Sequence, residues 1–271
     1  MKVPVKSKKS KSTGPKVLLL DIETKPIRAF VWDIWNINVA LNQIEEDWSI
    51  LSYSAKWLGD SKVFYEDIRK EKDYTNDKKL MQGLHDLLDE ADIIITQNGK
   101  SFDEKRIRSR FLKHEIDQPS SFKHIDTKRL AKKNVHMTSY SLDYMAKYLN
   151  TKHKKLSHAK FPGQALWTEC LKGNKEAWNE MKTYNINDVL VLEDVYNKLA
   201  PLDDSINWNV YHDDCEIRCS CGSTNFRNKG YSYTKTGMFR RWKCNDCGKP
   251  LIGRENLLTK EKKRSMREGP R

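Results

Sequence analysis

Apolar and polar positions along the first part of the chain follow the periods of strands and helices. Residues 17–23, 50–57 and 62–66 are short runs rich in apolar and β-branched residues, and each predicts a strand. Gly59 and Asp60 lie between the second and third runs and predict a hairpin turn. We therefore expect the first three strands to form a meander.

After this meander, predicted helices and strands alternate along the chain. Leucines recur at helical spacing within residues 77–90, and three successive isoleucines make residues 91–96 a run typical of a buried strand. The remaining expected elements are a helix at 102–114, a strand at 122–126 and helices at 128–133, 141–149, 164–171 and 174–199. This order predicts an α/β fold built around a mixed sheet that is flanked by helices.

Residues 27–47 show neither period, and we expect them to form a structured loop. The segment contains Trp32 and Trp35, and Trp57 ends a predicted strand. Because rings of this size are usually buried for most of their surface, we expect each of the three to lie in the core. The alternative is that they stack on the bases of a nucleic acid.

The positive charge of the chain lies at its two ends. The net charge is +13, with +6 in residues 1–16, +6 in 215–253 and +4 in 254–271, so the part between is mildly acidic. Basic flanks of this kind suit a polyanion, and nucleic acid is the expected partner. For the N-terminal residues a solubilising tail is the alternative. The expected regions are a disordered basic arm (1–15), a main domain (16–200), a linker (201–214), a cysteine-rich module (215–253) and a basic tail (254–271).

The sequence predicts no membrane segment. Its apolar runs fall short of the roughly 20 residues that a membrane-spanning helix needs, and the N-terminus lacks the apolar stretch of a secretion signal. We therefore expect an intracellular, cytoplasmic protein. In that compartment, five cysteines clustered near the C-terminus indicate metal binding rather than disulfides.

The first predicted strand ends in two acids separated by one residue, Asp21 and Glu23. Side chains two apart in a strand share a face, so these carboxylates would lie side by side. Adjacent carboxylates repel each other unless a positive charge lies between them, and their oxygens suit a hard ion such as Mg²⁺ or Mn²⁺. The alternative is a strand end whose acids face water.

Two further acids follow on other elements. Asp103 begins a predicted helix just after a buried strand. α/β sheets bind ligands at this end of their strands, so Asp103 is a candidate site residue. The alternative is an ordinary acid in the first turn of a helix. Tyr184 and Asp188 are four residues apart on the last long helix, so they share one face of it. The alternative there is a buried tyrosine beside a surface acid.

Together these motifs resemble a known group of nucleases. An acid pair on a strand is followed by Asn98-x-x-x-Phe102-Asp103 and then by Tyr184-x-x-x-Asp188. This order is similar to that of the DEDDy subgroup of RNase H-like (DnaQ-like) 3′→5′ exonucleases, and the loop motif is especially like that of family-B polymerase proofreading domains. The resemblance covers the main domain and implies a mixed five-stranded sheet flanked by helices.

Other stretches resemble the small stand-alone bacterial and phage members of this group, namely residues 124–131, 141–144 and 184–196. Asp126 and Asp143 lie in these stretches but outside the acid motifs, and we interpret both as structural. The resemblance implies a separate exonuclease, in the host cytoplasm if phage-encoded. Its protein partners would be unidentified replication, recombination or repair proteins.

The resemblance also implies hydrolysis of phosphodiester bonds with two Mg²⁺ or Mn²⁺ ions. Asp21 would bridge both ions, Glu23 and Asp188 would complete the site of the ion that activates water, and Asp103 would reach the second ion. Tyr184 would orient the attacking water. Since a tyrosine with a pKa near 10 is a poor base at neutral pH, we expect it to position the water rather than to deprotonate it.

Three neighbours of these acids are expected to contact the substrate. Ile22 and Phe102 would flank the terminal bases, as such neighbours do in this group, and Asn98 would form a hydrogen bond across the site. Single-stranded DNA is the favoured substrate, with RNA as the alternative.

The cysteine-rich module predicts a zinc ribbon. Two cysteine pairs enclose a loop of 22 residues and would bind one Zn²⁺ through four sulfur atoms, from Cys219, Cys221, Cys244 and Cys247. The first pair has C-x-C spacing, which departs from the usual ribbon, so Cys215 or His212 could replace one ligand. Arg240, Arg241 and Trp242 lie between the pairs among other basic and aromatic residues, a mixture that suits nucleic-acid binding. A purely structural or protein-binding ribbon is the alternative.

The leading hypothesis is thus a metal-dependent 3′→5′ exonuclease whose zinc ribbon helps to bind the substrate. One alternative is a non-catalytic nucleic-acid-binding or regulatory factor that uses the nuclease fold as a scaffold. Another is an endonuclease on the related RNase H-like fold.

Overall fold

The computed structural model describes residues 14–266, which belong to two compact units. One unit is Lys16–Lys198, and the other contains the chain from Leu199 onwards. The basic arm expected at residues 1–15 lies almost wholly outside the described residues, as do the last five residues of the basic tail. Within residues 14–266, no helix is long and apolar enough to cross a membrane.

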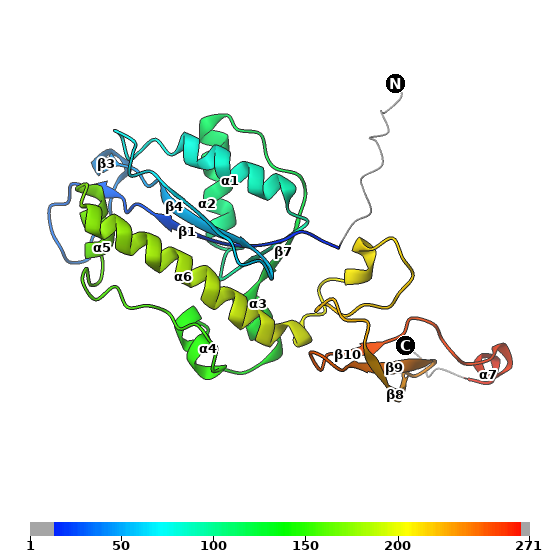
Figure 1. Cartoon of the computed structure of the whole chain (residues 1–271). Helices are drawn as coiled ribbons and strands as arrows, with labels where there is room; N and C mark the ends of the chain where they lie inside the picture. Colours follow the sequence, from blue (N-terminus) through cyan, green and yellow to red (C-terminus); the bar gives the residue numbers. More distant parts are fainter. Residues whose placement is uncertain (1–13, 267–271) are drawn as a thin grey trace, which may run out of the picture. The chain divides into compact units, whose positions relative to one another are not determined.

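A mixed sheet of five strands is the centre of the first unit (Figure 1). Its spatial order is β5 (Val63–Asp67), β4 (Ile50–Trp57), β1 (Val17–Thr24), β6 (Ile93–Thr96) and β7 (Lys123–Asp126). β4 is antiparallel to both of its neighbours, whereas β6 and β7 run parallel to β1. The predicted meander and the predicted mixed five-stranded sheet are therefore confirmed.

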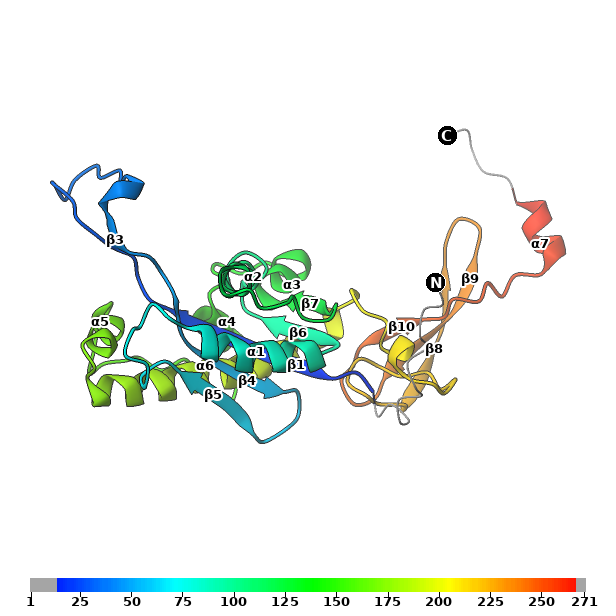
Figure 2. The ribbon, with the colours of Figure 1, turned by 90° about the horizontal axis from the view of Figure 1, so that it is seen from above.

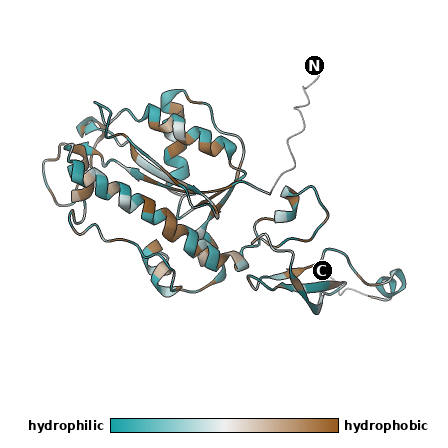
Figure 3. Ribbon diagram, viewed as in Figure 1, coloured by the Kyte–Doolittle hydropathy of each residue, from teal (hydrophilic) through white to brown (hydrophobic). Residues whose placement is uncertain are grey.

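Helices cover both faces of this sheet. In Figure 1, α1 (Lys78–Glu90) and α2 (Asp103–His114) lie on one side of it and α6 (Lys175–Leu199) lies on the other. The other helices of this unit are α3 (Thr127–Asn134), α4 (Leu142–Tyr148) and α5 (Ala165–Leu171). Leu18 and Leu19 of β1 have no exposed surface, which is what a central strand with both faces covered requires. The middle turns of α6 are strongly hydrophobic (Figure 3), and Val189 and Leu192 are buried there.

Residues 27–47, expected as a structured loop, form a loop with a short two-stranded stem, which gives it the form of a finger. Its stem is a two-stranded ladder of β2 (Arg28–Ala29) and β3 (Ile44–Glu46), and a short 3₁₀ helix (Leu41–Gln43) precedes β3. Figure 2 shows this segment, residues 28–46 and hereafter the finger, standing away from the sheet beyond the end of β1.

The expectation that all three tryptophans lie in the core is wrong for two of them. Trp32 is fully exposed and Trp35 is 77% exposed, because the finger carries them away from the domain. Trp57, on β4, is half-buried and packs against the core as expected. The argument from ring size fails at the finger because it assumes that a core lies within reach.

The second unit is built on a small antiparallel sheet. Its strands are β8 (Phe226–Tyr233), β9 (Met238–Cys244) and β10 (Pro250–Ile252), with β9 in the middle. Residues 201–214, expected as a linker, contain most of two 3₁₀ helices, Ala200–Leu202 and Trp208–Tyr211, and Trp208 is buried. The basic tail contains one short helix, α7 (Lys260–Ser265).

Candidate active site

Four acids converge beside the central strand of the sheet. One carboxylate oxygen from each of Asp21, Glu23 and Asp188 lies within 4.8 Å of the other two. Asp103 opens α2, where it is buried, and its Oδ1 accepts a hydrogen bond from the backbone N–H of Ile22, at 3.3 Å. The site thus combines acids of β1, α2 and α6.

Local backbone geometry explains why the two strand acids meet the other two. β1 is the central strand of the sheet. Asp21 and Glu23 are two residues apart, so they share the face of β1 that is covered by α6. The pairing of β1 with β4 shifts register between Glu23 and Thr24, and this irregularity ends the regular strand at the acid pair. Asp103 reaches the same place because β6 runs parallel to β1 and α2 begins soon after β6 ends.

Burial and mutual repulsion make these acids hard to ionise. Burial, together with the neighbouring carboxylates, raises the pKa of Asp21 well above its usual range and that of Glu23 to about 8. Burial also raises the pKa of Asp103 to about 7, although hydrogen bonds from backbone N–H groups oppose the shift. The site is therefore short of positive charge.

The donor set fits a hard divalent cation. Three carboxylates offer only oxygen ligands at close range, as Mg²⁺ and Mn²⁺ prefer. The buried Oδ1 of Asp188 has no hydrogen-bond partner among residues 14–266, so it is available as a ligand. A cation here would also relieve the repulsion that raises the carboxyl pKa values.

A lysine that sequence reasoning did not single out contributes positive charge to the site. The Nζ of Lys155 lies 2.7 Å from Oδ2 of Asp188 and 4.8 Å from the centre of the Tyr184 ring. Burial alone would lower the pKa of this lysine, but the Asp188 carboxylate and Tyr184 raise it, so its ammonium form is favoured. Lys155 comes from an irregular segment after α4 and stands among several other lysines, so the sequence carries no signal that distinguishes it.

Two other side chains hold the acids by hydrogen bonds. The indole N–H of Trp167, on α5, donates to Oε2 of Glu23 at 3.0 Å. The amide of Asn185 donates to Oδ2 of Asp21 at 2.6 Å. Asn185 immediately follows Tyr184, so its place in the tyrosine motif could have predicted that it lies at the site. No motif in the sequence marks Trp167 in this way.

Tyr184 lies within a small aromatic cluster. Its ring packs edge-on against those of His158 and Trp167, with ring centres 5.4 and 6.1 Å away. Burial and the nearby Asp188 carboxylate raise the pKa of Tyr184 to about 12, so its hydroxyl keeps its proton at neutral pH. The contacts with His158 and Trp167 hold the Tyr184 ring in place on the same face of α6 as Asp188.

The expected substrate contacts lie around the acids with different exposures. Ile22 is buried between Asp21 and Glu23, whereas Phe102 is partly exposed next to Asp103. Asn98 adopts a left-handed backbone conformation, with φ of 65°, and its backbone N–H donates to the Oδ1 of Asp126 at 3.1 Å.

The two acids that we interpreted as structural make contacts typical of that role. Asp126 is the N-cap of α3, where it accepts hydrogen bonds from the backbone N–H groups of Lys128 and Arg129. Asp143 forms a surface ion pair with Lys147, one turn further along α4.

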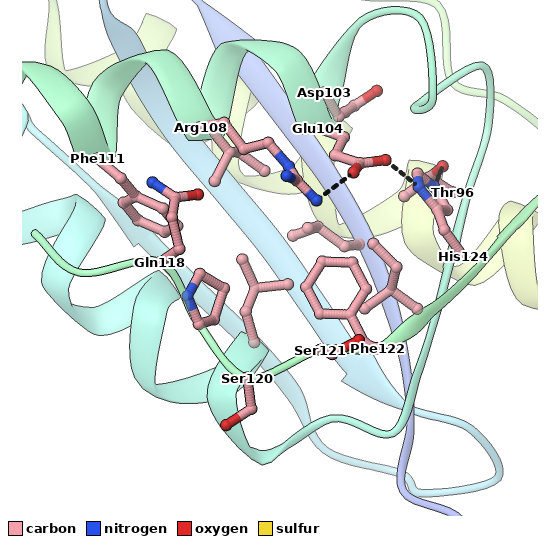
Figure 4. Close-up of a pocket in the computed structure, with 15 residues that line it drawn as sticks. Thr96, Asp103, Glu104, Arg108, Phe111, Gln118, Ser120, Ser121, Phe122 and His124 are labelled. Carbon is pink, nitrogen blue, oxygen red and sulfur yellow. Dashed lines mark hydrogen bonds and ion pairs between the residues drawn. The ribbon is translucent and has the colours of Figure 1, made fainter.

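A cavity of about 330 Å³ lies behind Asp103, between α2 and the strands β6 and β7 (Figure 4). A chain of hydrogen bonds crosses its polar end. Thr96 Oγ1 lies 2.7 Å from Nε2 of His124, and Nδ1 of His124 lies 2.6 Å from Oε2 of Glu104. Glu104 also forms an ion pair with Arg108 at 2.7 Å. This chain ties the first turn of α2, and with it Asp103, to the sheet.

The four cysteines expected to bind zinc are brought together in the second unit. The sulfur atoms of Cys219, Cys221, Cys244 and Cys247 all lie within 4.8 Å of one another, with Cys219–Cys247 at 3.4 Å and Cys221–Cys244 at 3.7 Å. Tetrahedral ligands about 2.3 Å from a Zn²⁺ ion would be about 3.8 Å apart, so the group fits zinc. Cys215 and His212, considered as substitutes, are not members of this group.

Arg240, Arg241 and Trp242, expected to bind nucleic acid, lie on β9. Arg240 and Arg241 are exposed, and Trp242 is half-buried. Arg241 donates to the backbone carbonyl of Lys229 on β8 at 3.0 Å, and Arg240 lies over the ring of Tyr231, 5.9 Å from its centre.

Comparisons with known proteins concern the first unit. Residues 18–200 match the family described as the RNase_H superfamily. A similar solved structure is that of the family B DNA polymerase from the hyperthermophilic archaeon Pyrobaculum calidifontis, with a TM-score of 0.50 and 15% identity. The alignment covers 69% of this chain but only 25% of the polymerase chain, and at this identity the likeness concerns the fold alone. No protein with a curated description matches the chain.

Proposed function

The chain belongs to the RNase H superfamily, and from this membership and its acidic site we propose that it is a 3′→5′ exonuclease of the DEDDy subgroup that needs divalent metal ions. The observation that carries the proposal is the convergence of three carboxylates within 4.8 Å, with Asp103 beside them. Tyr184, one helical turn before Asp188, favours the DEDDy subgroup.

The acids would hold two hard divalent ions, Mg²⁺ or Mn²⁺. Asp21, whose pKa is raised by all three other acids, would contact both ions, while Glu23 and Asp188 would complete one site and Asp103 would serve the other. When bound, such ions supply activation of water and stabilisation of charge on the leaving oxygen.

The remaining side chains would orient the reacting groups. Tyr184, with a pKa near 12, retains its proton and can donate a hydrogen bond to the attacking water or to the phosphate. Lys155 would offer positive charge to a phosphate oxygen beside Asp188. Trp167 and Asn185 restrict the rotation of Glu23 and Asp21 through their hydrogen bonds.

We further propose that the second unit binds one Zn²⁺ through its four cysteines and contributes substrate binding through β9. Its exposed Arg240 and Arg241 are suited to phosphates, and Trp242 and Tyr231 are suited to bases. Single-stranded DNA is the first substrate to test, and RNA is the second.

Digestion of 5′-labelled strands tests the catalytic proposal. Wild-type protein with Mg²⁺ or Mn²⁺ should shorten a labelled strand stepwise, and both Asp21→Ala and Asp188→Ala should lower the rate at least about 10³-fold, because each removes a carboxylate from the metal site. Both variants should still bind the strand. Matched single- and double-stranded DNA and RNA identify the substrate.

Several outcomes would contradict this proposal. Full activity of either variant would remove the acids from the mechanism. Cleavage of circular single-stranded DNA would indicate an endonuclease, because a circle has no end for an exonuclease. Strand binding without degradation under any metal condition would indicate a non-catalytic binding factor.

A further inference from the structure

The finger exposes an unusual amount of apolar surface. Trp32 is 100% exposed, Trp35 is 77% exposed and Phe30 is 70% exposed. Six aliphatic side chains nearby are also exposed, those of Ile27, Val31, Ile34, Ile37, Val39 and Leu41. Soluble proteins rarely leave an apolar patch of this kind uncovered unless it binds something.

The charges of the finger argue against an electrostatic role. Its only basic residue, Arg28, forms ion pairs with Glu45 and Glu46 across the stem, and Asp33 brings the net charge of residues 28–46 to −2. The adjoining Lys25 is buried and also pairs with Glu46. The finger therefore has no free cation to attract phosphates, whereas its exposed rings can stack on the flat faces of bases.

A row of flat groups leads from the acidic site to the stem of the finger. Phe102 directly precedes Asp103, and the guanidinium of Arg106 lies 4.3 Å from the centre of its ring. The same guanidinium lies 4.8 Å from the centre of the Trp48 ring, and Trp48 follows the last strand residue of the finger, Glu46, by two positions. Stacked groups therefore extend from the site to Trp48, next to the stem of the finger.

We propose that the finger is a stacking surface for the unpaired bases of a single-stranded nucleic acid whose 3′ end lies at the acidic site. This inference rests on the proposed function. Base faces are the occupant that the row of rings favours, since Trp and Phe stack on every base without sequence preference. β1 carries both Asp21 and Glu23 and continues into the stem after three residues, so the acids and the finger are held by the same strand.

Strand binding by the full-length chain tests the inference. Asp21→Ala is used as background so that the strand is not cut, and affinity for 5′-labelled single-stranded DNA and RNA of about 20 nucleotides is measured by fluorescence anisotropy. Adding Trp32→Ser and Trp35→Ser should weaken binding about fivefold or more for each ring that stacks. The dependence of affinity on salt should be unchanged, because these rings stack on bases and neutralise no phosphate. A weaker affinity for DNA, RNA or both supports the inference and identifies the substrate.

Matched controls separate stacking from general damage. Tyr148→Ser removes a similarly exposed ring from α4, outside the finger, and should leave affinity unchanged. An abasic strand of the same length should bind the background protein and the double tryptophan variant equally well, since it has no base faces. Thermal unfolding should be the same in both proteins, because exposed rings contribute little to stability.

Three results would overturn the inference. Equal affinity of the background protein and the double tryptophan variant for normal strands would exclude stacking. An equal loss of affinity for the abasic strand would show that bases are not what the finger contacts. Self-association in sedimentation that the double variant abolishes, with strand affinity unchanged, would assign the finger to a second copy of the chain.

Failure of the inference can be distinguished from failure of the proposed function. Stepwise digestion by the wild-type chain combined with unaltered binding by the double tryptophan variant would reject the finger alone. Tryptophan-dependent binding by a chain that digests nothing would reject the exonuclease and leave the finger as a strand-binding surface.

Discussion

At the scale of single residues, the acidic site is a set of charges that the fold brings together at a cost. Asp21, Glu23 and Asp188 lie within 4.8 Å of one another, and the ammonium of Lys155 offsets only part of their repulsion. Their raised pKa values mean that the folded chain without metal binds protons more tightly here than the unfolded chain does. Local stability is therefore linked to pH and to divalent ions.

Glu23 gives this linkage a direct test. Its pKa rises from 4.5 to about 8 on folding, so the stability that it contributes is fully present below pH 4.5 and is lost as the pH rises through about 8. Glu23→Gln removes that loss, so the metal-free variant should unfold a few degrees above the metal-free wild type at pH 8.5 and at nearly the same temperature at pH 4.5.

Thermal unfolding at several pH values, without added divalent ions, checks this expectation. Asp117→Asn, which removes an exposed acid outside the site, is the matched control and should show no such trend. Adding Mg²⁺ or Mn²⁺ at pH 8.5 should raise the unfolding temperature of the wild type more than that of Glu23→Gln. A difference that does not vary with pH would contradict the assigned cause.

Sequence reasoning identified the acids but not all of their partners. Asp21 and Glu23 could be paired because strand geometry places residues two apart on one face, and the helical turn did the same for Tyr184 and Asp188. The contacts of Lys155 with Asp188 and of Trp167 with Glu23 could not be predicted. Lys155 lies in an irregular segment and Trp167 on a separate short helix, and no sequence period relates these to the elements that carry the acids. Such contacts depend on how the elements pack.

At the scale of elements, the position of α2 decides where Asp103 lies. The helix is fixed at its first turn by the chain from Thr96 through His124 to Glu104, at the polar end of the cavity shown in Figure 4. Burial lowers the pKa of His124, although Glu104 opposes the shift. A neutral imidazole can donate to Glu104 while it accepts from the hydroxyl of Thr96.

Replacing this imidazole tests the role of the hydrogen-bond chain. His124→Leu keeps the size of the side chain but leaves the Thr96 hydroxyl and the Glu104 carboxylate without their partner, so we expect a loss of about 1–3 kcal/mol in the free energy of unfolding. Urea denaturation measures it. Ser109→Ala, on the exposed side of α2, is the control, and its stability should change by less than about 0.5 kcal/mol. An equally small change for His124→Leu would contradict the role of the hydrogen-bond chain.

The elements themselves were largely readable from the sequence, with one instructive failure. Continuous apolar runs predicted the buried strands β1 and β6, and apolar residues at helical spacing predicted α1. The finger did not follow this rule, because its apolar residues face solvent and obey no period. An expectation based on burial cannot anticipate apolar residues that contact something outside the chain.

At the scale of the whole molecule, the two units divide charge between them. The first unit holds an acidic site, whereas residues 215–271 carry an excess of ten positive charges. A polyanion would be attracted by the second region and hydrolysed in the first. The electrostatic part of binding and the stacking part should therefore be separable.

Removal of residues 215–271 tests this division. The shortened chain keeps the whole of Lys16–Lys198, which has its own core, and should still digest strands. Its affinity should fall and depend less steeply on salt, with the log–log slope reduced by about 0.7 for each phosphate that is no longer neutralised. Unchanged affinity and slope would contradict a role of the second unit in binding.

The strand β1 carries the acid pair near its end, and the finger begins after three intervening residues. The acidic site, where the strand is cut, and the finger, where it is bound, would then be separated by a fixed length of nucleic acid. A strand long enough to span both would stay attached between successive cuts, whereas a shorter one would be released. Digestion would accordingly be processive at first and would end with a short oligonucleotide remnant of characteristic length rather than with single nucleotides alone.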